Sequence, residues 1–172
     1  MIAEIGHFAL ILALVLSVVQ CVLPLVGAAR GIGSWMALAR TAAYANALFL
    51  TISFGTLAYS FYISDFTLLN VASNSNSLLP WFYKVAASWG SHEGSILFWA
   101  LMLTWWGFLV ALTSRKLPQE TVDRVLGVMG FITAGFVAFM LFTSNPFLRL
   151  FPAAPEGADL NQIGRASCRE RV

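Results

Sequence analysis

Charged residues are scarce in this chain. Only 10% of its 172 residues are Asp, Glu, Lys or Arg, whereas 59% are hydrophobic. Soluble domains carry about a quarter charged residues, so this composition excludes a water-soluble globule and favours several membrane spans. The formal net charge of +2 is too small to indicate a nucleic-acid partner.

Cysteine is also scarce. The chain has two cysteines, Cys21 and Cys168, and it contains neither CxxC nor CxxCH. This excludes a zinc-type cluster and a thiol-exchange pair, so no metal site is predicted. The absence of CxxCH also excludes a c-type cytochrome.

The N-terminus lacks the features of a secretory signal peptide. No Lys or Arg precedes its first apolar run, and that run extends from Phe8 to Gly27, which is longer than the hydrophobic region of such a peptide. We therefore expect a first span that is retained.

Four segments are long and apolar enough to cross a membrane. They cover residues 5–27, 41–63, 95–113 and 125–143. Apart from His7 near the start of the first, these segments contain no Asp, Glu, Lys, Arg or His. A transporter or a membrane subunit of a respiratory complex is an alternative function for this chain. Such proteins place ionisable groups at membrane depth, so their absence here disfavours this alternative. The predicted fold class is all-α, a polytopic membrane protein with about four transmembrane helices.

The loops differ in their positive charge. Loops 28–40 and 114–124 together hold five Lys or Arg, whereas the long loop 64–94 holds only Lys84. By the positive-inside rule, the two basic loops face the cytoplasm. The N-terminus and the long second loop then face the outer side.

The long second loop combines turn-forming and aromatic residues. Asn and Ser alternate over residues 73–77 and favour turns. Pro80 can begin a helix, and Trp81, Phe82 and Tyr83 suit the boundary between membrane and water. We expect a short interfacial helix over residues 80–87.

This loop leads into a glycine-flanked block at the mouth of the third span, WGSHEGS at residues 89–95. The imidazole of His92 could ligate haem iron or move protons, and Glu93 could orient the ring. The alternative is structural, because an acid in the first turn of a helix is favoured by the helix dipole. Both interpretations remain open from composition alone.

The third span also carries an aromatic stripe. Residues 92, 95, 99, 102 and 106 fall along one face of a helix, at intervals of three and four. Trp99 and Trp106 on this stripe could face a planar ligand or pack against another helix.

The last ten residues, 163–172, differ from the rest of the chain. They hold three Arg and one Glu, and they resemble the translation of a common sequencing adapter. We expect this tail to be non-native and the native protein to continue beyond residue 161 or 162. Without the tail, seven basic residues balance seven acidic ones, and the net charge is zero.

Several blocks of the chain carry a family resemblance. They are EIGHFAL (4–10), NSNS (74–77), WGSHEGS (89–95), TSNPF (143–147) and GADLN (157–161). In this order they resemble the CcmF family, the haem-lyase subunit of bacterial cytochrome c maturation, and the NrfE-type haem lyase shares them. The resemblance implies that residues 1–162 are the N-terminal transmembrane part of a cytochrome c assembly protein.

The resemblance also implies a location and a set of partners. Such a protein crosses the bacterial inner membrane several times, with its N-terminus and long second loop in the periplasm. It receives haem from the haem chaperone CcmE and, with a CcmH-type thiol subunit, helps attach it to apocytochrome c. The whole protein is expected to be part of a haem lyase, and this stretch alone to be inactive.

The resemblance transfers no haem ligand, catalytic residue or metal ligand, because the tryptophan-rich motif and ligating histidines of the family lie beyond this stretch. We expect five residues to support the outer haem or partner surface, none of them assigned as a ligand. They are Trp89, Gly90, His92, Glu93 and Gly94. For this stretch taken alone, a non-catalytic membrane scaffold is the alternative.

Overall fold

The computed structural model describes residues 1–158, and the tail expected to be non-native lies outside them. The helices are α1 (Ile2–Arg30), α2 (Gly33–Met36), α3 (Leu38–Tyr62), α4 (Leu69–Asn74), α5 (Trp81–Gly90), α6 (His92–Thr113), the 3-10 helix η1 (Ser114–Lys116) and α7 (Gln119–Phe142). An isolated antiparallel bridge between Leu68 and Arg149 is the β-type pairing in this part of the chain.

The predicted all-α membrane fold is confirmed. Four helical segments, Ile2–Arg30, Gly33–Tyr62, His92–Thr113 and Gln119–Phe142, are long and apolar enough to span a membrane. At about 1.5 Å per residue, even the 22 residues of α6 exceed the hydrocarbon thickness of about 30 Å. Each helix begins before its predicted span, because its first turn contains polar or charged residues that a search for apolar runs leaves out.

The ends of these helices are set by local chemistry. α1 stops where Gly31 adopts a left-handed conformation (φ 69°), and the N–H of Ile32 donates to the Gly27 carbonyl at 2.9 Å. α6 begins at His92 because the Ser91 hydroxyl accepts a hydrogen bond from the Gly94 N–H at 3.1 Å. Pro118 precedes α7, where the absence of a backbone N–H costs nothing.

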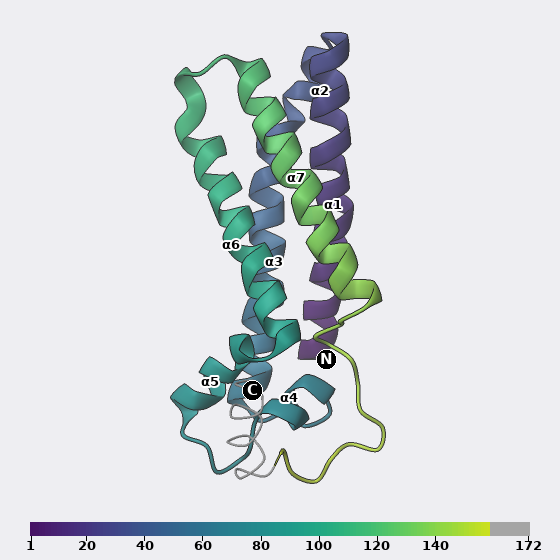
Figure 1. Ribbon diagram of the computed structural model, residues 1–172, viewed down its shortest axis with the longest axis vertical. Coiled ribbons are helices and arrows are strands. Elements are labelled where there is room, and N and C mark those ends of the chain that lie inside the picture. The colour runs from purple at the N-terminus through teal and green to yellow at the C-terminus, as the bar shows by residue number, and fades with distance from the viewer. Residues whose placement is uncertain (159–172) are drawn as a thin grey trace, which may run out of the picture.

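The four long helices form a bundle in which each contacts two others closely (Figure 1). α1 packs against α3 and α7, and α6 packs against the same two helices from the other side. α2 and η1 lie at one end, which we call the short-loop end. At the other, long-loop end lie the N-terminus, α4, α5 and the segment 143–158.

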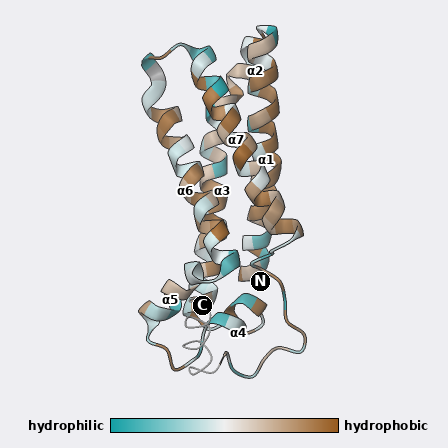
Figure 2. Cartoon of the chain, viewed as in Figure 1, coloured by the Kyte–Doolittle hydropathy of each residue, from teal (hydrophilic) through white to brown (hydrophobic). Residues whose placement is uncertain are grey.

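Apolar and polar residues separate along the bundle (Figure 2). Hydrophobic colour dominates the long helices, and hydrophilic patches gather toward the two ends. The larger apolar core cluster includes Leu10, Leu57, Leu97 and Met140, and it lies in the half of the bundle next to the long-loop end. This core brings all four long helices together.

A buried pair of amides ties three helices inside the bundle. The side-chain amides of Gln20 on α1 and Asn46 on α3 lie 2.7 Å apart. Gln20 Nε2 also donates to the Leu126 carbonyl of α7 at 2.9 Å. This contact requires a small neighbour, because a Cβ added to Gly130 of α7 would lie 3.0 Å from Gln20 Cγ. Polar pairs between close helices are typical of membrane bundles.

Replacing Asn46 with Leu should destabilise the bundle by about 1 kcal/mol, because Gln20 loses its amide partner in a site that excludes water. A double-mutant cycle with Gln20→Leu, followed by unfolding in mixed detergent micelles, would measure the coupling between the two amides. The matched control is Asn74→Leu at the long-loop end, outside the four spans. Additive effects of the two Leu substitutions would contradict the pairing.

Candidate functional site

The long-loop end is assembled from segments that are far apart in the sequence. The backbone N–H of Leu69 donates to the Leu148 carbonyl at 2.9 Å, and the Leu150 N–H donates to the Thr67 carbonyl at 2.8 Å. Further along, the Ala158 N–H donates to the Ala72 carbonyl at 2.8 Å. The segment after α7 is therefore held against the segment around α4 by backbone hydrogen bonds.

Arg149 joins this pair of segments to the first helix. Its Nη1 donates to Thr67 Oγ1 at 3.0 Å, and its Nη2 donates to Glu4 Oε1 at 3.1 Å. The Glu4 side chain is 69% exposed, so the ion pair itself contributes little stability. Its consequence is geometric, because it fixes the first turn of α1 beside the loop that follows α7.

Both histidines contact the same short stretch after α7. Nδ1 of His92 lies 3.2 Å from Ser144 Oγ, and Nδ1 of His7 lies 3.4 Å from Asn145 Nδ2. Asn145 Oδ1 accepts the Phe147 N–H at 2.9 Å, which orients the Asn145 amide with its nitrogen toward His7. Because an amide nitrogen can only donate, His7 Nδ1 is the acceptor in this contact.

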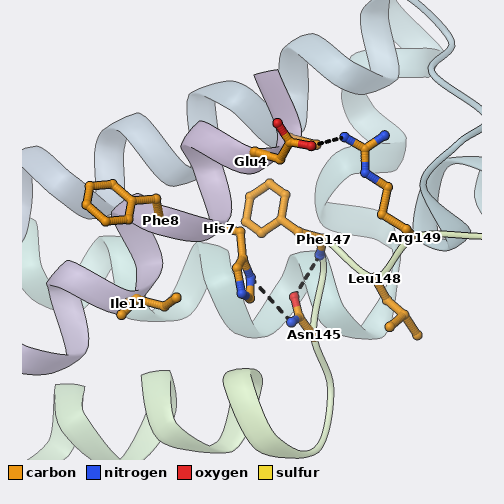
Figure 3. Close-up of a pocket in the computed structure, with 9 residues that line it drawn as sticks. Glu4, His7, Phe8, Ile11, Asn145, Phe147, Leu148 and Arg149 are labelled. Carbon is orange, nitrogen blue, oxygen red and sulfur yellow. Dashed lines mark hydrogen bonds and ion pairs between the residues drawn. The ribbon is translucent and has the colours of Figure 1, made fainter. Parts of the chain in front are cut away.

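A pocket of about 340 Å³ opens between α1 and this stretch (Figure 3). Glu4, His7 and Phe8 line it from α1, and Phe147 and Arg149 line it from the other side. Ion-pairing groups at one edge and aromatic rings at the other give it both polar and apolar walls. Its charged groups already have partners within the chain.

The Phe147 ring reaches the pocket across a glycine. A Cβ added to Gly6 would lie 2.5 Å from the Phe147 ring. The ring also meets His7 edge-on, with centroids 6.3 Å apart. Glycine at this position therefore allows the segment after α7 to seat itself on α1.

The predicted WGSHEGS block forms the corner between α5 and α6. Trp89 and Gly90 end α5, Ser91 is the only residue between the helices, and the Ser95 hydroxyl donates to the Trp89 carbonyl at 2.7 Å. Gly94 is required at this corner, because an added Cβ would lie 1.8 Å from the Ser88 carbonyl oxygen.

The five predicted site residues thus divide into two groups. Gly94 is buried in the corner and Glu93 is half-buried in the first turn of α6, where the helix dipole favours its charge. Trp89, Gly90 and His92 are exposed, with Trp89 at 45%. The geometry gives a structural reason for Gly94, whereas His92 is exposed and contacts Ser144 through Nδ1.

Sequence reasoning did not select the residues around the pocket. The sequence blocks that resemble the CcmF family include or adjoin these residues, Glu4, His7, Asn145 and Arg149, but the sequence alone indicates no role for them. His7 and Asn145 are 138 residues apart, and no local pattern shows that they meet. No group of three or more His, Cys, Asp or Glu suited to a metal ion occurs within residues 1–158.

Glu156 secures the far end of the segment after α7. Its carboxylate accepts the Ser77 N–H at 3.0 Å, the Ser77 hydroxyl at 2.7 Å and the Gly157 N–H at 3.0 Å. These hydrogen bonds, that of Gly157 above all, lower the pKa of Glu156 below its usual value. Asn76 Nδ2 donates to the Ala158 carbonyl at 3.0 Å beside it.

The fold and the assembled long-loop end define a segment of a polytopic membrane protein. Comparison with known proteins narrows this class. No protein-family model matches the chain. Over 164 residues, 95% of its length, the chain is 55% identical to the cytochrome c-type biogenesis protein CcmF of Pseudomonas aeruginosa and 51% identical to that of Haemophilus influenzae.

The chain is therefore homologous to the CcmF family, and the resemblance stated from its sequence blocks is confirmed. The NrfE protein of Haemophilus influenzae is 44% identical over 95% of the chain. The solved structure of a cytochrome c haem lyase CcmF matches the fold with a TM-score of 0.80 and 27% identity, over 88% of this chain and 26% of that one. The chain spans about a quarter of the length of the curated relatives it matches.

The corner between α5 and α6 supplies a matched pair of glycine substitutions. Gly94→Ala should destabilise the protein by about 1–3 kcal/mol, because its Cβ would collide with the Ser88 backbone. Gly90→Ala should be tolerated, because an added Cβ there meets nothing within 4 Å. Thermal unfolding in detergent compares the two variants, and equal stability would disprove the tight corner.

The hydrogen bonds that the Glu156 carboxylate accepts from Ser77 and Gly157 should weaken in acid. Because its pKa is lowered in the folded state, its contribution is fully present above the usual value of 4.5 and is lost as the pH falls through the lowered value. Hydrogen exchange at the Ser77 amide should accelerate over that range beyond the intrinsic pH effect. Glu156→Gln, which cannot titrate, should remove the excess pH dependence, and its persistence would refute the assignment.

Proposed function

We propose that this chain is the N-terminal membrane segment of a CcmF-type protein that handles haem during cytochrome c maturation. The observation that carries the proposal is the 55% identity to CcmF over 95% of the chain. The matching fold of a cytochrome c haem lyase CcmF supports it. The complete protein delivers haem for covalent attachment to apocytochrome c.

The bundle favours one orientation in the bacterial inner membrane. Arg30, Arg40, Lys116 and Arg124 all belong to the short-loop end, whereas Lys84 lies in the long loop. Under the positive-inside rule, the short-loop end faces the cytoplasm. The N-terminus, α4, α5 and the segment 143–158 then face the periplasm, where cytochrome c receives its haem.

At the periplasmic face, α5 lies at the level of the lipid headgroups. Trp81, Phe82 and Tyr83 are each more than half exposed, and flat amphipathic rings partition to this boundary. Lys84 of the same helix donates from Nζ to Ser64 Oγ at 2.7 Å, which ties α5 to the end of α3. Membrane lipid is thus one partner of this surface.

The haem or partner surface lies beside α5, at the corner with α6. It comprises Trp89, Gly90, His92, Glu93 and Gly94. His92 stands at the mouth of a hollow of about 530 Å³ whose other walls are apolar, including Ile96 and Phe139. The exposed imidazole would contact haem from the periplasmic side of this hollow, and the haem iron supplies the redox chemistry when bound. His92 would contact it while Ser144 holds Nδ1.

The protein partners meet the same face. Haem arrives from the chaperone CcmE, a CcmH-type subunit manages the thiols, and apocytochrome c accepts the haem. The segment 143–158 presents a fixed surface to them, because backbone bonds, Arg149 and Glu156 hold it at several points. A preformed surface loses less conformational entropy on binding than a mobile one.

A non-catalytic scaffold is the second candidate. Within the block, Ser91, Gly94 and Ser95 are all used to build the corner. On this alternative, His92 serves only to hold Ser144 at the start of the segment after α7. The two functions make different demands on the imidazole.

Substitutions of His92 separate these functions in a full-length protein. Residues 1–158 would replace the matching quarter of Pseudomonas aeruginosa CcmF in a strain lacking its own copy. His92→Gln retains a hydrogen-bonding side chain toward Ser144 but cannot act as imidazole. If His92 serves haem, both His92→Gln and His92→Ala should lower haem-stained cytochrome c several-fold.

His7→Gln is the control, since its imidazole already contacts Asn145 beside a different pocket. Normal maturation with His92→Gln would favour the scaffold. Failure of the unmodified chimera to mature any cytochrome c would overturn the proposed function itself.

A further inference from the structure

A groove runs along the outside of the bundle between α6 and α7. Two adjoining cavities, of about 530 and 360 Å³, share Ile132 and Phe136 of α7 as common walls. The first opens at His92, and the second is lined by Trp99, Met102 and Trp106 of α6. The groove therefore extends along the two helices from the long-loop end toward the middle of the spans.

The walls of this groove are aromatic and uncovered. Trp99 is 68% exposed and Trp106 is 61% exposed, whereas the neighbouring Ala100 is fully buried in the bundle. The predicted aromatic stripe of the third span thus lies on the outside of the bundle, along the groove beside α7.

The two indoles also have polar groups to satisfy. Trp105 donates from Nε1 to Thr51 Oγ1 at 3.1 Å, but within residues 1–158 the indole N–H groups of Trp99 and Trp106 have no acceptor. Hydrocarbon chains offer no acceptor either, whereas the hydroxyl or amide of a neighbouring helix does. The indoles favour protein over lipid as the cover of this groove.

A glycine is exposed at the groove. Gly135 lines the cavity that opens at His92, and an added Cβ there would meet nothing within 4 Å. Small residues at exposed positions of a membrane span allow a second helix to approach closely. This notch lies next to Phe136, beside the larger aromatic rings.

The outward face of α1 provides a contrast. Val15, Val18 and Val22 are each about half exposed, and none of them lines a cavity found in the described part of the chain. A smooth row of aliphatic side chains suits contact with lipid tails. The two uncovered faces of the bundle therefore differ in shape and in chemistry.

We propose that the groove between α6 and α7 seats an apolar transmembrane helix from the rest of the CcmF-type protein. The relatives are about four times as long as this chain, so most of such a protein lies outside it. The inference rests on the proposed family role of the chain. The seated helix places a hydroxyl or amide against the indoles and a small residue near Gly135.

Photo-crosslinking in the full-length chimera tests this assignment. A benzoyl-phenylalanine replaces Phe136 in the groove or, as the matched control, Val15 on α1. A protease site inserted after residue 158 then allows the chain to be cut from the remainder. Crosslinking at position 136 should keep the two fragments joined on a denaturing gel, several-fold more than at position 15.

Other outcomes overturn the proposal. Fragments that separate and carry lipid adducts at position 136 would show that lipid covers the groove. A crosslinked product of twice the full mass would show a second copy there. Because the readout is the crosslink and not matured cytochrome c, it is independent of the test of the proposed function.

A second pair of variants gives a readout without a crosslinker. Gly135→Phe should fill the notch and lower the melting temperature of the full-length chimera, whereas Gly135→Ala should change it little. Val18→Phe adds similar bulk on the α1 face and should leave the melting temperature unchanged. A chimera that tolerates Gly135→Phe as well as Val18→Phe would contradict a seated helix.

Discussion

A hydrocarbon interior offers no hydrogen-bond partner, and this constraint decides where most polar side chains of the four spans lie. Thr51, Ser60 and Thr133 return their hydroxyls to carbonyls of their own helices. Gln20 and Asn46 satisfy each other across a helix interface and reach the backbone of α7. Within residues 1–158 the indole N–H groups of Trp99 and Trp106 have no acceptor, and by the same constraint lipid would supply none either.

Ionic contacts and most of the long-range polar contacts collect at the ends of the bundle. At the long-loop end, no single contact is strong, because Glu4, Arg149 and Glu156 are wholly or partly exposed. Together they connect α1, the region of α4 and the segment after α7, and the two histidines reach adjacent residues of that segment. A surface held at many weak points keeps its shape while remaining accessible to large partners.

The four spans could be predicted because hydrophobicity is a local property of the sequence. An apolar run of about 20 residues by itself indicates a transmembrane helix. The predicted third span begins at residue 95, whereas the helix that contains it begins at His92, because Ser91 caps α6 and hydropathy does not detect a cap. The WGSHEGS block was recognised as special, but the need for Gly94 depends on the path of the Ser88 backbone. The pocket around His7 could not be predicted, because its walls come from opposite ends of the chain and meet only through tertiary packing. Whether the block and His92 serve haem remains a prediction.

The corner between α5 and α6 has a mechanical consequence. Only Ser91 separates the two helices, and the Ser88 carbonyl lies close against Gly94, so little room is left for the helices to move independently. If α5 lies among the lipid headgroups, as proposed above, a change in the tilt of α6, such as a thicker or thinner bilayer imposes, moves α5 relative to the headgroups. The aromatic rings of α5 favour the boundary between membrane and water, so the corner couples the tilt of α6 to the position of α5.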